Sequence, residues 1–95
     1  IQMIVVQMKD ELEKIKELSS QLMRPEHIAL LLDVDLDEFK RKIKHKGSDV
    51  YRAYETGKAE TILELRKQEI KLAKLGSPLA VDMVHRFIVD QEENE

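Results

Sequence analysis

Hydrophobic residues recur at helical spacing along nearly the whole chain. In residues 1–22 they alternate in steps of four and three, the heptad spacing of a helix that packs against another helix, and we expect this helix at about residues 3–22. This stripe contains Ile1, Val5, Met8, Leu12, Ile15 and Leu22, with Ser19 in the remaining slot. Further helices are predicted at residues 25–32, 36–45, 48–75 and 78–91. The pattern therefore predicts an all-α protein, although the β-branched run at residues 4–6 leaves a short strand open there.

Residues that begin or end helices separate these segments. Pro25 suits the first turn of the second predicted helix, and Ser48 can cap the fourth. The run Gly76-Ser77-Pro78 provides a C-cap, an N-cap and a first helical residue in succession. Because this connection is so short, we expect the long helix and the last helix to form an antiparallel hairpin.

Residues 28–43 follow the register of a helix-turn-helix. Asp33 stands at the tight turn, where a residue tolerant of left-handed backbone geometry is needed. Asp35 is placed to cap the second helix, and Glu38 three residues later would complete a capping box. The positions that two short crossed helices must bury are small or apolar: Ile28, Ala29, Leu32, Val34, Phe39 and Ile43. Helix pairs of this kind also occur in small bundles that bind no nucleic acid.

The charge distribution favours a DNA contact on the second helix of this unit. The net charge of the chain is −3, but residues 36–46 carry +3 while residues 1–35 and 76–95 carry −3 and −4. A local basic patch matters more than the total for phosphate binding. The candidate DNA-binding residues are Lys40, Arg41, Lys42, Lys44, Lys46 and Arg52. The acidic first turn of the helix opposes this contact, since its carboxylates repel phosphate unless they face away or meet cytosine amino groups.

The tyrosine pair and the glycine of the long helix each allow two interpretations. Tyr51 and Tyr54 lie one turn apart, which favours a role in the core over stacking on bases. Gly57, inside the long helix, marks either a kink or a close contact.

Residue types needed for other functions are missing or badly spaced. The chain has no cysteine, so it has no disulfide or thiolate site, and we expect a reducing, cytoplasmic compartment. Its three histidines are widely separated, and the acidic run at residues 33–37 lacks the glycine and glutamate of a calcium loop, so we expect no metal site. There is no nucleophile elbow or phosphate-binding glycine loop, which predicts neither an enzyme nor a cofactor. No apolar run approaches the roughly 18 residues that cross a bilayer, so we expect no membrane contact.

The stretch VYRAYETGKAETILELRKQEIKLAKLGSPLAVDMVHRFIVDQ resembles the segment that follows the helix-turn-helix in phage terminase small subunits. The similar features are the Gly57-Lys58-Ala59-Glu60 motif at the start of a long helix, and the turn LAKLGSPLA at residues 72–80 before a last apolar helix. Each motif is short, and the resemblance rests on their order over about residues 25–91.

The resemblance implies a non-enzymatic adaptor that binds double-stranded viral DNA for genome packaging. Such proteins act as homo-oligomers, usually rings, and present DNA to the terminase large subunit, which here implies the host cell cytoplasm. The resemblance also implies a DNA-binding region at residues 1–46, made of the N-terminal helix and the helix-turn-helix. Residues 47–95 would then form a helical hairpin for oligomerisation. The predicted oligomer interface comprises Val5, Met8, Leu12, Ile62, Leu65, Met83 and Phe87.

Two other functions remain open at this point. A small helix-turn-helix transcription regulator would act as a dimer on a palindromic site. A helical protein-assembly module would show no salt-dependent affinity for DNA.

Overall fold

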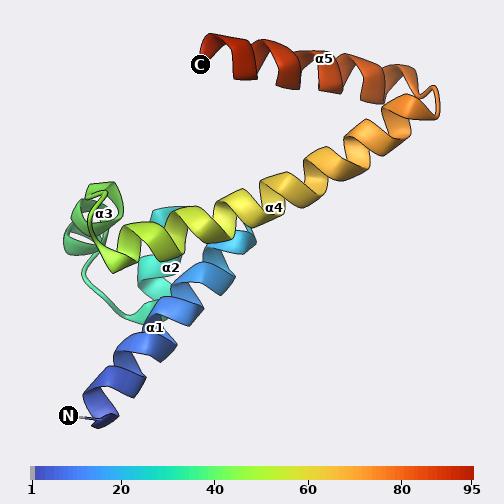
Figure 1. The fold of residues 1–95 in the computed structure, drawn as a ribbon. Coiled ribbons are helices and arrows are strands. Elements are labelled where there is room, and N and C mark those ends of the chain that lie inside the picture. Colours follow the sequence, from blue (N-terminus) through green and yellow to red (C-terminus); the bar gives the residue numbers. More distant parts are fainter. Residues whose placement is uncertain (1) are drawn as a thin grey trace. The chain divides into compact units, whose positions relative to one another are not determined.

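The computed structural model describes the backbone from residue 2 to residue 95 and the side chains from Lys9 onward (Figure 1). The described chain is all α-helical, as the sequence predicts, and the strand alternative at residues 4–6 is wrong. The predicted interface residues Val5 and Met8 lie outside the described side chains. The helices are α1 (Gln2–Ser20), α2 (Pro25–Leu32), α3 (Leu36–Lys44), α4 (Asp49–Lys74) and α5 (Pro78–Glu93).

The chain forms two compact units, one ending at Thr61 and one comprising Ile62–Glu95. We call these the N-terminal unit and the C-terminal unit. The boundary falls inside α4, because the first half of this helix packs on α1 and on the helix-turn-helix.

The N-terminal unit has a small core in which each of its helices takes part. The most buried side chains come from α1, α2, α3 and α4, and Ile28 at the centre is 0% exposed. Burying a large aliphatic or aromatic side chain stabilises a fold by about 1.5–3 kcal/mol, so a few such residues can hold a unit of this size. The buried residues are Ile15, Ile28, Ala29, Phe39, Ile43 and Tyr54, with Leu12, Leu32 and Val34 packed at the edge.

The turn of the helix-turn-helix forms as predicted. Asp33 adopts a left-handed conformation with φ 56° and ψ 49°, which ends α2. The Val34 amide donates to the Ala29 carbonyl at 3.0 Å, and the Asp33 amide donates to the Leu30 carbonyl at 3.3 Å. These two bonds form a Schellman motif, in which the left-handed residue redirects the chain into α3.

Helices α1 and α4 approach each other closely at Gly57. Ser19 is 0% exposed and occupies the slot of the α1 stripe where the other members are apolar. The Thr61 hydroxyl donates to the Ser20 carbonyl at 2.5 Å, and Lys16 pairs with Glu60 at 3.4 Å, so the two helices are also linked by polar contacts. Gly57 therefore marks a close contact, and α4 continues through it without interruption.

In the C-terminal unit, α5 folds back from α4 as predicted. Gly76 has φ 97°, and the Ser77 amide donates to the Leu72 carbonyl at 3.2 Å, which ends α4 in a second Schellman motif. The Ser77 hydroxyl then accepts from the Ala80 amide at 3.4 Å and caps α5, with Pro78 in its first turn. Arg66 of α4 reaches α5, where it pairs with Asp90 at 3.4 Å.

Candidate nucleic-acid interface

The first turn of α3 carries carboxylates whose roles are local. Asp35 caps the helix by accepting from the Glu38 amide at 2.9 Å. The Glu38 carboxylate reaches forward along α3, to Lys42 at 3.3 Å and to Arg41 at 4.0 Å. Only half of the predicted capping box is therefore formed, because the Glu38 side chain is engaged by the basic residues one turn later.

Lys40 connects α3 to α2. Its ammonium group lies 3.0 Å from the Glu26 carboxylate, with both side chains about two-fifths exposed. The pKa of Glu26 lies below its ordinary value, first because its carboxylate accepts from its own backbone amide in the first turn of α2, and then because of Lys40. The ion pair stabilises the charged form of Glu26 and links α2 to α3 in the helix-turn-helix.

Hydrogen bonds of Ser48 link the two ends of the turn between α3 and α4. The Ser48 hydroxyl donates to the Lys42 carbonyl at 2.7 Å and accepts from the Tyr51 amide at 2.9 Å, so one side chain joins the end of α3 to the start of α4. The Ser48 amide also donates to the His45 carbonyl at 2.9 Å. Ser48 therefore caps α4, as the sequence predicts. Its hydrogen bonds also hold the backbone of the turn that carries the nearby lysine and arginine side chains.

Three of the six predicted DNA-binding residues flank this turn and are exposed. Lys44 is the last residue of α3, Lys46 lies in the turn, and Arg52 follows in the first turns of α4. Within the part of the chain whose side chains are described, none of the three forms an ion pair with a carboxylate, whereas Lys40, Arg41 and Lys42 all do. The unpaired cations among these six residues therefore all lie at the α3–α4 turn, and we call Lys44, Lys46 and Arg52 the basic turn.

Tyr54 belongs to the core. Its ring meets Phe39 edge to face, with 6.3 Å between the ring centroids, and the Lys58 ammonium lies 5.1 Å from the Tyr54 centroid. Burial raises the pKa of Tyr54, because the phenolate would lose its hydration. The prediction that Tyr54 packs in the core is confirmed. The Lys58 ammonium group, which lies against the Tyr54 ring, also pairs with Glu55 at 3.8 Å.

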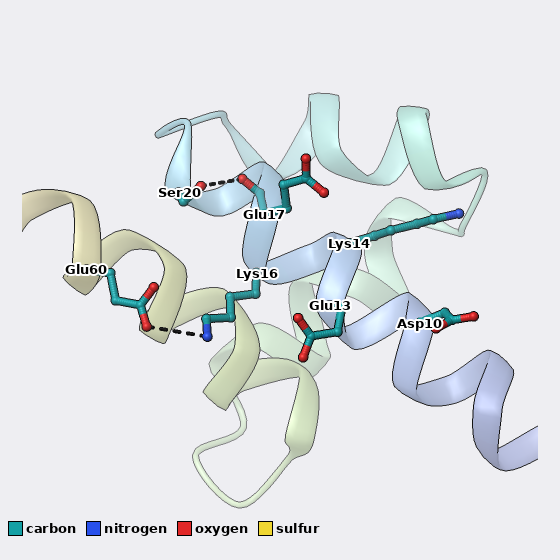
Figure 2. A pocket seen from close by; sticks show the side chains of 7 residues that line it. All are labelled: Asp10, Glu13, Lys14, Lys16, Glu17, Ser20 and Glu60. Carbon is teal, nitrogen blue, oxygen red and sulfur yellow. Dashed lines mark hydrogen bonds and ion pairs between the residues drawn. The ribbon is translucent and has the colours of Figure 1, made fainter.

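A polar hollow of about 430 Å³ lies between α1 and α4 (Figure 2). Its side chains are mostly exposed, and only Lys16 and Glu60 pair across it. Among the described residues, no group of three or more histidine, aspartate or glutamate side chains is placed to hold a metal ion. The hollow is lined by Asp10, Glu13, Lys14, Lys16, Glu17, Ser20 and Glu60, a set of mostly solvated polar side chains.

A second groove, of about 360 Å³, lies beside the basic turn and was not predicted. Leu12 and Ile15 of α1 line one side, and Arg41, His45 and Val50 line the other. Leu12, predicted at an oligomer interface, is half-buried against the core in the single chain. The groove depends on the packing of α1 against the α3–α4 turn, which sequence periodicity does not reveal.

Comparison of the chain with family models, with curated proteins and with solved structures gives no match. None of the described helices has an apolar stretch long enough to traverse a bilayer.

Proposed function

We propose that this protein is a non-enzymatic adaptor that binds double-stranded DNA through the α3–α4 turn. The observation that carries this proposal is the basic turn: three exposed cations without carboxylate partners in the described structure, in a chain whose net charge is −3. A local group of unpaired cations is suited to bind a polyanion even when the net charge of the chain is negative.

The contact is mainly with phosphate. The first turn of α3 presents Asp35, Asp37 and Glu38, which disfavour a close approach of this end of the helix to the DNA backbone. The basic turn lies at the opposite end of α3, where lysine and arginine side chains can track a backbone without reading bases. Lys40, Arg41 and Lys42 can join the contact, since exchanging an exposed ion pair for a phosphate costs about 0–1 kcal/mol.

The order of motifs supports a role in viral genome packaging. A helix-turn-helix followed by the Gly57-Lys58-Ala59-Glu60 helix, a Gly-Ser-Pro turn and an apolar helix resembles a phage terminase small subunit. In that role the protein acts as a homo-oligomer, binds viral DNA in the host cytoplasm and presents it to the terminase large subunit. The competing function is a dimeric transcription regulator, for which one palindromic sequence would be strongly preferred.

The test is binding of a fluorescently labelled DNA duplex, followed by anisotropy over a range of salt concentrations. Each phosphate contact contributes about −0.9 to the slope of log K against log salt. The triple variant Lys44→Glu, Lys46→Glu, Arg52→Glu should lose binding at physiological salt. The matched control is Lys9→Glu, Lys14→Glu, Arg86→Glu, which makes the same charge change on exposed residues elsewhere.

Circular dichroism of both variants checks that the helices are intact. Loss of binding in the basic-turn variant with retention in the control supports the proposal. Parent-like binding by the basic-turn variant, equal loss in both variants, or a parent protein with no affinity for DNA would each overturn it. A strong preference for one palindrome over unrelated duplexes would replace the packaging role by the regulator.

A further inference from the structure

The chain leaves α1 through a leucine in a left-handed conformation. Helix α1 ends at Ser20, and Leu22, which periodicity assigns to its apolar stripe, lies beyond that end with φ 59°. The Leu22 amide donates to the Ser19 carbonyl at 2.9 Å. Among the described residues, left-handed geometry is otherwise found at Asp33 and Gly76, whose residue types tolerate it. A leucine is strained there, because its Cβ atom crowds the next carbonyl oxygen.

The core does not explain a leucine at this position. Leu22 is 49% exposed, so burial of its side chain offsets only part of the conformational cost. Glycine adopts the same backbone without strain and is the usual residue where a helix ends in left-handed geometry. Strained residues cluster where a protein holds a ligand, so Leu22 points to a binding site.

Leu22 lines a hollow of about 240 Å³ between the α1–α2 connection and α4. The end of α1 lies beside the middle of α4 (Figure 1), where the Thr61 hydroxyl donates to the Ser20 carbonyl. The other lining residues are Met23, Arg24, Pro25, Tyr54 and Lys58. The described walls of this hollow are therefore apolar or cationic, without a carboxylate.

Both cations of the hollow can bind an anion. The Arg24 guanidinium donates to His27 Nε2 at 3.1 Å, which orients the group and leaves most of its N–H donors available. The Lys58 ammonium lies 5.1 Å from the Tyr54 ring centroid, and its distance of 3.8 Å to Glu55 is long for an ion pair. Such a partly exposed pair contributes little, so another carboxylate can replace Glu55.

The size and the walls of the hollow favour part of a peptide. Pockets that enclose a whole small molecule usually have volumes of about 300–1,000 Å³, and this hollow is smaller. The apolar wall also offers nothing to a sugar–phosphate backbone, which is bound through charge and hydrogen bonds. An apolar side chain next to a carboxylate matches both parts of the hollow.

We propose that this hollow binds an acidic segment of a partner protein. An aspartate or glutamate of the segment contacts Arg24 and Lys58, and a neighbouring leucine-sized side chain packs on Leu22 and Met23. The planar guanidinium suits a carboxylate, which it can bind through two parallel hydrogen bonds. The site contains no residue of the basic turn, so the inference goes beyond DNA binding and does not depend on it.

The probe is a library of random dodecapeptides displayed on phage and selected on the immobilised full chain. Enriched peptides are synthesised with a fluorescent label, and their affinity is measured by anisotropy. We expect the enriched sequences to share an acidic residue beside a large apolar residue.

Two pocket variants test where these peptides bind. Leu22→Gly removes the apolar contact, and Arg24→Gln with Lys58→Gln removes both charges. Each should weaken the selected peptides about tenfold or more, because a few central side chains carry most of the affinity of an interface. Circular dichroism checks that the helices are intact.

Each pocket variant has a matched control. Lys14→Gln with Lys67→Gln removes two exposed charges elsewhere. Leu75→Gly removes a 76% exposed leucine from the turn after α4, where φ is not positive. Both controls should bind the peptides as the parent does.

Urea unfolding separates a binding role of Leu22 from a structural one. Leu22→Gly should be at least as stable as the parent, because glycine removes the strain. Lower stability of this variant would overturn the proposal, since the leucine would then serve the fold.

Three results of the selection would also overturn it: no enriched peptide, enriched peptides without acidic residues, or parent-like affinity in either pocket variant. The last result would place acidic peptides elsewhere, for example on the basic turn. Affinity for a labelled DNA duplex is measured in the same variants and should not change. If Arg24→Gln with Lys58→Gln loses duplex binding and no peptide is selected, the hollow contacts DNA instead.

Discussion

Gly57 of α4 lies against Ser19 of α1 so closely that no side chain fits between the two helices. A Cβ atom at Gly57 would overlap both the Ser19 hydroxyl oxygen and the backbone carbonyl oxygen of Lys16. The hydroxyl belongs to a side chain, but the carbonyl belongs to the helix itself and moves only if α1 moves.

We expect Gly57→Ala to destabilise the protein. Alanine favours a helix by about 1 kcal/mol over glycine, but forcing an extra methyl group into a filled contact costs about 1–3 kcal/mol, and a backbone contact lies at the upper end. Urea unfolding followed by circular dichroism should show a net loss of about 1–2 kcal/mol.

Two further variants test the cause of this loss. Gly47→Ala should change stability little, because its Cβ would lie 3.5 Å from the nearest atom, His45 Nε2. In a Ser19→Ala background, Gly57→Ala should remain destabilising, since the Lys16 carbonyl is still in place. Full recovery of stability in that background would contradict the backbone contact.

Asp33→Gly should stabilise the helix-turn-helix by about 0.5–1 kcal/mol, because glycine reaches the left-handed conformation without the Cβ penalty. Asp33 is exposed with φ 56°, so a substitution there acts mainly on the backbone. Asp33→Asn keeps most of the preference for left-handed backbone geometry and removes the charge, so it separates the effect of conformation from the effect of charge. Asp33→Val should destabilise the protein. Thermal unfolding checks the order; a Val variant as stable as the Gly variant would contradict it.

The titration of Tyr54 should occur above its ordinary pKa of 10.0, because burial disfavours the phenolate. A group whose pKa is raised on folding contributes stability below its unfolded pKa, and this contribution is lost as the pH rises through the folded value. We therefore expect the fold to weaken above about pH 10.

Absorbance of tyrosinate measures this shift directly. In a Tyr51→Phe variant, Tyr54 is the only tyrosine and its midpoint can be read alone. The midpoint should lie above 10.0 in the folded protein and return to that value in concentrated urea. Equal midpoints in the two states would contradict the burial of the hydroxyl group.

The features that could be predicted from the sequence are those determined within a few residues. The helix ends at Asp33, Ser48 and Gly76 depend on local capping and left-handed geometry, and the structure forms each one. Helical periodicity also identified the core positions of the helix-turn-helix, from Ile28 to Ile43.

Features that depend on which segments meet could not be predicted in the same way. The sequence allows either a kink or a close contact at Gly57, since its partner Ser19 is 38 positions away along the chain. The Lys40–Glu26 ion pair arises only when α2 and α3 pack. Leu65, predicted at an oligomer interface, and Leu72 are 49% and 47% exposed in the single chain, because periodicity identifies an apolar row but not what covers it.

The ion pairs on α3 lead to a prediction about DNA affinity. Glu38 holds Lys42 and Arg41 beside the basic turn, and its own negative charge opposes a phosphate there. Glu38→Gln removes this charge and releases both cations, while the backbone amide that donates to Asp35 is retained. The variant should bind a DNA duplex several-fold more tightly at low salt, with a steeper salt dependence, because up to two more basic side chains can replace counterions on the DNA.

Anisotropy titration checks this prediction against Glu13→Gln, which makes the same charge change on the exposed surface of α1. If both variants gain affinity equally, net charge alone is responsible; if Glu38→Gln gains none, α3 does not face the DNA.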